Sequence, residues 1–347
     1  MRRGLLRSKG RPGAARRRHC LKDLTIGTHV LAFDAAGLID GIVAADRAGL
    51  NTAWLVSGGT SPEPLAIFAA AAGQTEQIGF GTSIIPTWPR HPLAVVQGAV
   101  VVDQLAPGRL KLGVGPSHKP GIEGMYGFEF VRPLQHLREY LTILKATLQE
   151  GSVSFHGEQL QAEASLQPPP MAPGQPDQKI VTQVKVMASA LRPNAYRLCG
   201  EVADGAISWV SPLHHLERVA VPAMAEGAQA AGRERPALVS HVPVVVSEDA
   251  EAVWQASHAQ LGFYPNAPYY SAMWQDAGFP EAAEGTYSRA MSDALVIQGS
   301  EEEVAERIRA LPSSGVNEML AGVLQLEGDP AAADRTIELL GALAQES

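Results

Sequence analysis

Residues 81–92 form a proline-rich segment whose composition suits the binding of a planar ring. The segment contains Pro86, Pro89 and Pro92, with Trp88 between the first two. Proline fixes its own φ angle and restricts the residue before it, so we expect a stiff loop. Such a loop could hold a flat cofactor in place, and it could equally be a rigid connector between two elements.

A second segment, residues 113–120, combines groups that bind phosphate with a group that can exchange a proton. Gly113 and Gly115 would let the backbone approach a ligand closely, and successive backbone N–H groups can bind phosphate. His118 is the candidate catalytic proton donor, because histidine titrates near neutrality. Its alternative role is a hydrogen bond to backbone or to a cofactor, and Glu123 is a weaker candidate acid.

The elements that would position these segments alternate between short β-rich runs and longer helical patterns. We predict strands over residues 25–31, 52–56, 77–85, 109–114, 184–188, 205–210, 237–247 and 318–324. We predict helices over residues 37–48, 63–72, 93–105, 133–149, 194–202, 213–231, 301–311 and 331–344. Repeated βαβ units of this number most simply close into an α/β fold, the (β/α)8 TIM barrel. An open doubly wound sheet is the alternative, although no Gly-x-Gly-x-x-Gly fingerprint follows the first strand.

Two stretches interrupt the alternation and are predicted as insertions within a single barrel domain, residues 24–347. Residues 151–182, after helix 4, indicate a hairpin and then a Pro/Gly-rich stretch, and a second insertion after strand 7 extends to about residue 297. Active sites of such barrels lie at the C-terminal ends of the strands. The two segments above follow strands 3 and 4, so both would lie at that end. His29 could point into the barrel from strand 1, whereas His91 is expected to be structural.

Composition restricts the classes of protein that this chain can be. Of its 347 residues 46% are hydrophobic and 18% are charged, which fits a large globular domain. Residues 1–22 carry nine Lys and Arg and no acid, which leaves 19 basic against 36 acidic residues in the remainder. An acidic body argues against nucleic-acid binding by the domain. We interpret residues 1–23 as a disordered basic extension, with a nucleic-acid arm or a transit peptide as alternatives.

The cysteines and the hydropathy pattern predict a cytoplasmic protein without a membrane segment. Two cysteines, Cys20 and Cys199, are too few for a disulfide framework or a zinc site. No cluster of His and Asp recurs at the predicted strand ends, so we expect no bound metal. Cys199 lies in an apolar helical stretch and is expected to be a core residue. No apolar stretch approaches the length that a transmembrane helix needs.

Several motifs, taken in order, resemble the luciferase-like monooxygenase superfamily, and most closely its branch that uses the 5-deazaflavin coenzyme F420. The resemblance spans about residues 24–345 and is carried by six segments, 78–92, 108–115, 138–141, 190–193, 199–205 and 299–307. Each motif is moderately specific alone, and their order and spacing together are much more so. The resemblance implies a (β/α)8 barrel that contains insertions.

The resemblance also implies a cofactor site. A non-proline cis peptide at the end of strand 3 would form a bulge behind the cofactor ring, and it falls at Ser83–Ile84 in this chain. The phosphate-bearing tail would lie along the glycine-rich loop and along backbone after strand 5. The implied cofactor-binding residues are Ser83, Ile84, Thr87, Gly113, Gly115, Ser117, Ala190 and Leu191.

This chain departs from the family pattern in two places. Relatives often have His or Gln after strand 2, where this chain has the sequence Ser-Gly-Gly-Thr at residues 57–60. Relatives also often have glycine at the position of Arg192, whose guanidinium could pair with phosphate or crowd the tail. The first departure puts in doubt an acid/base role at that position.

The function that the resemblance implies is hydride transfer between coenzyme F420 and a small organic substrate. The substrate would lie between Trp88, Tyr126 and the aromatic residues of the second insertion, which could instead pack the insertion itself. An FMN-dependent monooxygenase and a non-catalytic flavin- or deazaflavin-binding partner protein are the alternatives. We expect a small-molecule substrate, no nucleic acid and no membrane as partners, and a homodimer is compatible with the sequence.

Overall fold

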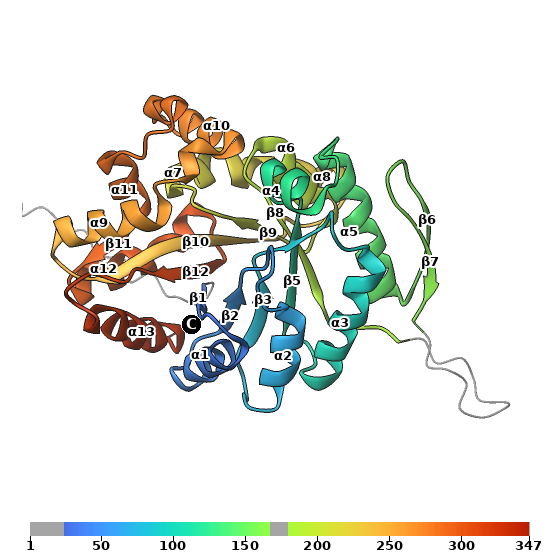
Figure 1. The fold of residues 1–347 in the computed structure, drawn as a ribbon, viewed down its shortest axis with the longest axis horizontal. Helices are drawn as coiled ribbons and strands as arrows, with labels where there is room; N and C mark the ends of the chain where they lie inside the picture. Colours follow the sequence, from blue (N-terminus) through green and yellow to red (C-terminus); the bar gives the residue numbers. More distant parts are fainter. Residues whose placement is uncertain (1–23, 167–179, 347) are drawn as a thin grey trace, which may run out of the picture.

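A closed parallel barrel surrounded by helices forms the body of the computed structural model, which describes residues 24–166 and 180–346 (Figure 1). Within these residues eight parallel strands pair in the order β1-β2-β3-β5-β8-β9-β10-β12, and β12 closes the ring by pairing with β1. The strands are β1 (Thr25–His29), β2 (Thr52–Leu55), β3 (Gly79–Thr82), β5 (Leu110–Gly115), β8 (Lys185–Ser189), β9 (Gly205–Ser208), β10 (Ala237–Val246) and β12 (Glu318–Val323). The predicted TIM barrel is confirmed. The predicted basic extension and the Pro/Gly-rich stretch at 168–176 lie outside the described residues.

The outer layer consists of helices that pack their apolar faces on the barrel strands. They are α1 (Ala35–Arg47), α2 (Pro64–Ala72), α3 (Pro92–Leu105), α5 (Pro133–Glu150), α6 (Pro193–Val202), α8 (Val221–Ala230), α12 (Glu301–Arg309) and α13 (Ala331–Ala344). Local signals set their ends. The side chain of Asp34 accepts a hydrogen bond from Gly37 N at the start of α1, and Ser300 and Glu303 form a capping box at the start of α12. In the described ranges no helix is both long enough and apolar enough to span a membrane.

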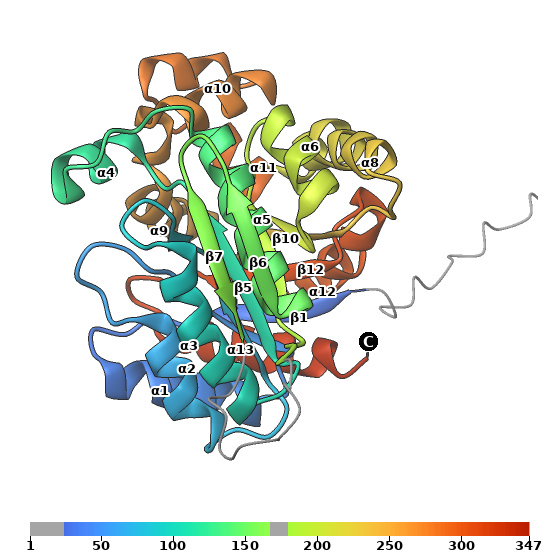
Figure 2. The same ribbon diagram turned by 90° about the vertical axis from the view of Figure 1, so that its right-hand side faces the viewer.

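A hairpin lies outside the helical layer, where the sequence predicts the first insertion. Its strands are β6 (Ser152–His156) and β7 (Gln161–Ser165), and Figure 2 shows them running along α5. The carboxylate of Glu139, on α5, accepts hydrogen bonds from the backbone N–H groups of Glu158, Gln159 and Leu160 at 2.8–2.9 Å. A Cβ at Gly157 would overlap this carboxylate, so glycine is required where the turn meets the helix. One buried acid therefore holds the turn of the hairpin against α5.

The second insertion follows β10 and forms a small helical layer above the barrel (Figure 1). It comprises α9 (Ala250–Leu261), η2 (Tyr264–Asn266), α10 (Pro268–Asp276), η3 (Pro280–Glu284), α11 (Arg289–Leu295) and β11 (Ile297–Gly299). Its own apolar cluster includes Trp274, Tyr287 and Met291. Trp274 is fully buried in this cluster, which also contains Val210 from the barrel, so it packs the insertion onto the strand ends.

Four local predictions differ from the structure. The predicted strand 77–85 is two strands, β3 and β4 (Ile85–Pro86), because the chain bulges between them. The loop after β5 contains a short helix, α4 (Lys119–Tyr126), that its glycines and proline did not indicate. The predicted helix 213–231 consists of α7 (Leu213–His215), a π-helical turn η1 (Leu216–Ala220) and α8. The predicted helix 301–311 ends at Arg309 and is followed by η4 (Leu311–Ser314).

Trp54 fills the N-terminal half of the barrel and explains two glycines in neighbouring strands. Its side chain is fully buried between β1 and β3. A Cβ at Gly27 would lie 2.8 Å from Trp54 Nε1, and a Cβ at Gly81 would overlap the indole ring. The two glycines therefore make room for an indole inside the barrel, a role that is separate from ligand binding.

Candidate active site

The chain bulges at the C-terminal end of β3, where the peptide bond Ser83–Ile84 is cis. The predicted cis bond is therefore confirmed at the predicted position. Backbone pairing of β3 with β5 stops at Gly81 and resumes with Ile85 of β4. The hydroxyl of Thr82 fills the gap, since it donates to Gly113 O at 2.7 Å and accepts from Gly113 N at 2.8 Å. A single side chain thus replaces the strand hydrogen bonds that the bulge interrupts.

Replacing Thr82 with Val is expected to lower the free energy of unfolding by about 1–3 kcal/mol, because the buried Gly113 N–H would lose its acceptor. Urea denaturation would measure this loss. Thr82→Ser is the matched control, since it keeps the hydroxyl and removes only a methyl group. An equal loss in the two variants would show that the hydroxyl does not hold the bulge.

The bulge forms part of the floor of the barrel mouth. Ile84, at its tip, is partly buried and packs with Trp209 on an interior cluster of apolar side chains. That cluster consists of Trp54, Met187, Ile207, Val239 and Leu320. Beside it, Ser83 Oγ and Thr87 Oγ1 are buried and have no hydrogen-bond partner among the described residues. The floor is therefore apolar at Ile84, with two unsatisfied hydroxyl groups next to it.

The glycine-rich loop after β5 contains two glycines with different neighbours. A Cβ at Gly113 would overlap the carbonyl oxygen of Thr82 and the side chain of Ile207, so glycine is needed for packing inside the barrel. A Cβ at Gly115 would overlap Ser189 Oγ and come within 3.2 Å of Ile84. Ser117, two residues on, has a φ of 60°, which is uncommon outside glycine. Only the outer part of this loop is therefore placed to meet a ligand.

Two helices begin at the mouth with backbone N–H groups that no capping side chain satisfies. They are α4, whose N-cap is His118, and α6, whose N-cap is Arg192. They follow β5 and β8, which are neighbours in the barrel. Ala190 is buried and donates its N–H to Ile207 O, while Leu191 is partly buried beside it. Free N–H groups at helix N-termini favour anions, so this side of the mouth suits a phosphate group.

The two polar side chains at these helix starts have different environments. Arg192 pairs with Asp276 of α10 at 2.5 Å, so its guanidinium links the barrel to the second insertion. His118 is exposed, and its ring centroid lies 5.7 Å from that of Tyr270. Desolvation by neighbouring groups lowers the pKa of His118, which keeps the ring mainly neutral at neutral pH. The candidate proton donor therefore faces the insertion.

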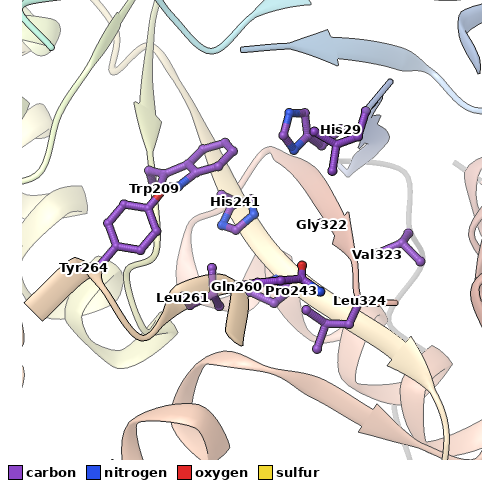
Figure 3. Close-up of a pocket in the computed structure, with 11 residues that line it drawn as sticks. His29, Trp209, His241, Pro243, Gln260, Leu261, Tyr264, Gly322, Val323 and Leu324 are labelled. Carbon is purple, nitrogen blue, oxygen red and sulfur yellow. Dashed lines mark hydrogen bonds between the residues drawn. The ribbon is translucent and has the colours of Figure 1, made fainter. Parts of the chain in front are cut away.

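A cavity of about 260 Å³ opens at the mouth between the ends of β1, β10 and β12 and the second insertion, and we call it the histidine pocket (Figure 3). His29 from the end of β1 and His241 from β10 point toward it, with Trp209 between the barrel and Tyr264 of the insertion. The complete lining is His29, Leu31, Trp209, His241, Pro243, Gln260, Leu261, Tyr264, Gly322, Val323 and Leu324. The pocket thus combines residues from opposite ends of the chain.

Ring contacts fix Trp209 within this pocket. Its indole stacks on His241 at a centroid distance of 3.8 Å and meets His29 edge-on at 5.7 Å. Trp209 Nε1 donates a hydrogen bond to the Tyr264 hydroxyl at 2.5 Å. The next residue, Val210, is buried with a φ of 52°, an unfavourable value for a β-branched residue that surrounding packing must maintain. The position of the indole is therefore well determined.

Burial keeps both histidines of the pocket neutral. It lowers the pKa of His29 to about 4 and, with a contribution from His29, the pKa of His241 to about 3. His29 Nε2 and His241 Nδ1 are buried and have no hydrogen-bond partner among the described residues. A Cβ at position 322 would lie 2.5 Å from His241 Nε2, so Gly322 makes room for this ring.

The structure separates the aromatic residues that the sequence groups around a substrate. Trp88 stacks on His136 at 3.9 Å and contacts Phe130, and it is not part of the pocket lining. His91 Nε2 lies 3.1 Å from Gln161 O and its ring caps α3, which agrees with a structural role. Cys199 is fully buried in α6 and its pKa is raised to about 12, as a core residue requires.

Sequence reasoning did not identify His241, Gln260 or Gly322 as site residues. A signal exists for His241, because it is the one ionisable residue in the strand Ala237–Val246, whose other members are apolar except for Ser240. Trp209 lies in a loop at the strand ends, where active-site residues are expected. Gln260 follows a helical pattern and carries no comparable signal.

The sequence profile of a family described as luciferase-like monooxygenase matches residues 18–318 of this chain. An uncharacterized protein of Mycobacterium tuberculosis is 29% identical over 69% of this chain and 72% of its own length. The F420-dependent glucose-6-phosphate dehydrogenase of Segniliparus rotundus is 24% identical over 83% of this chain and 88% of its own length.

Solved structures with the same fold include enzymes that use different cofactors. The coenzyme F420 dependent tetrahydromethanopterin reductase from Methanopyrus kandleri has a TM-score of 0.72 at 20% identity, covering 92% of this chain and 98% of its own. An oxygenating subunit of 3,6-diketocamphane monooxygenase from Pseudomonas putida, in complex with FMN, has a TM-score of 0.68 at 20% identity, covering 93% and 98%. At this level of identity the likeness shows the shared fold.

Proposed function

This chain belongs to the luciferase-like monooxygenase family, and from that premise we propose that it is an F420-dependent oxidoreductase acting on a small organic substrate. The observation that carries the choice of cofactor site is the bulge at Ser83–Ile84, which presents Ile84 on an apolar floor at the barrel mouth. Relatives named as F420-dependent dehydrogenases support the choice of cofactor.

The residues at the mouth fit a molecule with a flat ring and an anionic tail. Ile84 would contact the ring, while Ser83 and Thr87 carry buried hydroxyls without partners next to it. The tail would follow the outer part of the glycine-rich loop, at Gly115 and Ser117, toward the start of α4. The backbone at Leu191 and the uncapped start of α6 would bind its phosphate, and Ala190, whose N–H already donates to Ile207 O, would place this segment beside the tail. Gly113 would contribute by shaping the loop, since packing already accounts for its lack of a side chain.

The protein would contribute orientation, exclusion of water and proton transfer to this reaction. Coenzyme F420, when bound, supplies or accepts the hydride. The second insertion covers one side of the mouth and would keep water from the reacting atoms. His118, at the start of α4, would hold the proton that enters or leaves the substrate, and its lowered pKa makes the neutral ring available as a base.

Titration of the purified protein with cofactors tests this proposal. We expect reduced and oxidised F420 to bind with a dissociation constant in the low micromolar range or below, measured by the fluorescence of the deazaflavin. FMN and NADPH, titrated in the same way, are the controls and should bind at least tenfold more weakly. Absence of F420 binding below high micromolar concentrations would refute the proposed cofactor.

An FMN-dependent monooxygenase is the second candidate function, and a neighbour with this fold that is solved with FMN favours it. The two functions differ in what they consume. An F420 enzyme changes the deazaflavin absorbance when substrate is added and needs no oxygen, whereas the monooxygenase would consume oxygen with reduced FMN. Binding of F420 without turnover of any substrate would instead favour a non-catalytic partner protein. The sequence Ser-Gly-Gly-Thr at residues 57–60, which lacks the His or Gln expected after β2, keeps that alternative open.

A further inference from the structure

The histidine pocket offers no charged side chain to a ligand. Of its eleven lining residues in the described part of the chain, none is Lys, Arg, Asp or Glu. Two cations that belong to neighbouring segments of the mouth are paired elsewhere, since Arg192 binds Asp276 and Lys119 lies 3.7 Å from Glu123. An anionic group entering this pocket would lose its hydration without gaining a counter-charge, which is unfavourable.

Most side chains that line the pocket are apolar, and so are the exposed side chains around its opening. Leu261 from α9, Pro243 from β10, and Val323 and Leu324 from the end of β12 all line it (Figure 3). At the rim Leu31, a lining residue, is 73% exposed, and Phe33 and Phe263, within two residues of lining positions, are 106% and 59% exposed. An apolar molecule that binds here would cover these exposed side chains, and removing their apolar surface from water would favour binding.

A few polar atoms in the pocket remain for hydrogen bonding. Trp209 Nε1 already donates to the Tyr264 hydroxyl, so the indole N–H is not free to orient a ligand, whereas the partly buried Tyr264 hydroxyl still has its own proton to donate. His29 Nε2 is buried without a partner and its ring points toward the cavity. His241 is held under the indole of Trp209, and Gln260 lies on the exposed side. His29 is therefore the best-placed group for a single buried hydrogen bond.

We propose that the histidine pocket binds a neutral alcohol or carbonyl compound with an apolar body, and that His29 hydrogen-bonds its oxygen. In the tautomer with hydrogen on Nε2, a neutral imidazole can donate to the oxygen of a carbonyl compound or of an alcohol, so His29 serves either oxidation state of such a substrate. The inference rests on the proposed function, because it names the substrate class of that reaction. It moves the contact to the substrate oxygen from His118, which does not line the pocket, to His29, which does. It also separates this chain from relatives named for glucose 6-phosphate, whose phosphate would find no cation here.

Four matched probes test the pocket in the absence of cofactor, so that its failure is distinct from a failure to bind F420. They are benzyl alcohol, toluene, benzoate and phenyl phosphate, with binding measured by saturation-transfer NMR and calorimetry on the full chain. We expect benzyl alcohol to bind most tightly, toluene about five- to tenfold more weakly, and the two anions at least tenfold more weakly than benzyl alcohol. Tighter binding of phenyl phosphate than of benzyl alcohol, or no binding of any probe, would overturn the proposal.

Variants then locate the hydrogen bond. His29→Phe should weaken benzyl alcohol about five- to tenfold and leave toluene unchanged, because the ring size is kept and only the nitrogens are lost. His156→Phe, on the exposed face of the hairpin, is the matched control and should change neither. Circular dichroism and a urea titration establish that each variant is folded. Equal affinity of the wild type and His29→Phe for benzyl alcohol would refute the role of His29.

Discussion

Lys111→Met is expected to lower the free energy of unfolding by about 3–5 kcal/mol, because it leaves a buried carboxylate without its counter-charge. Lys111 Nζ lies 2.5 Å from Glu318 Oε2, and the Glu318 side chain is 6% exposed. The pair joins β5 to β12 across the barrel interior, near the N-terminal ends of the strands. Thr52 accepts from Lys111 at 2.9 Å and Trp54 donates to Glu318 at 3.1 Å, so the pair is also hydrogen-bonded on both sides.

Substituting the partner residue, Glu318, should lower the free energy of unfolding much less. Glu318→Gln keeps an oxygen that can accept from Trp54, and the Lys111 side chain is 27% exposed and can be hydrated. The double variant, Lys111→Met with Glu318→Gln, should be more stable than Lys111→Met alone, since it removes the unpaired charge. Urea denaturation of the four proteins gives the complete double-mutant cycle. A loss below about 1 kcal/mol for Lys111→Met would show that Glu318 does not depend on this cation for its charge.

The sequence predicts the barrel because its signal is local and repeated. Each parallel strand is a short apolar run followed by a helical pattern, so the alternation is visible without knowing which strands pair. The prediction is weaker where tertiary contacts decide the backbone. The bulge that splits β3 from β4 depends on the Thr82 hydroxyl meeting Gly113, thirty-one positions later in the chain. The cis bond at Ser83–Ile84 was predictable only from the resemblance to a family.

The candidate site is less predictable than the fold because its residues converge from distant strands. His29, Trp209 and His241 belong to three strands or strand ends, and their contact follows from the closure of the barrel. Lys111 and Glu318 are 207 positions apart and look like ordinary strand residues in the sequence. The position of a residue at a strand end correctly predicts that it lies on the active-site face of the barrel. Which of these side chains contact each other depends on strand register and twist, which the sequence does not show.

Acidification from pH 7 to pH 5 is expected to remove about 4 kcal/mol of stability through His29 and His241 alone. In the unfolded chain each imidazole takes up a proton near pH 6.5, whereas in the folded protein burial lowers the pKa to about 4 for His29 and about 3 for His241. The unfolded state therefore binds more protons below pH 6.5, so stability is complete above that pH and falls as the pH decreases toward 4. The interval of about 1.5 pH units corresponds to about 2 kcal/mol for each group.

Other titrating groups can be separated from this effect. Burial also lowers the pKa of His118, His136 and His215, so these add to the loss in the same direction. For Glu139 burial acts to raise the pKa, but hydrogen bonds from Gln135 and from backbone outweigh it, so the net shift is downward. The ionised Glu139 carboxylate therefore contributes stability that is present above the pKa of the unfolded carboxyl. This contribution is lost as the pH falls through the lowered folded-state pKa, which is below the interval from pH 7 to pH 5.

Substitution isolates the contribution of the two pocket histidines. His29→Phe and His241→Phe should each reduce the loss of stability between pH 7 and pH 5 by about 2 kcal/mol, measured by urea denaturation at both pH values. The comparison between pH values within one variant removes any change in packing that the new ring causes. His156→Phe is the matched control, because this exposed ring is surrounded by solvent in both states. An unchanged pH dependence in both pocket variants would mean that these imidazoles take up protons in the folded protein as readily as in the unfolded chain. The pocket would then hold cations at pH 5 and would accept the anionic probes that its neutral lining is expected to exclude.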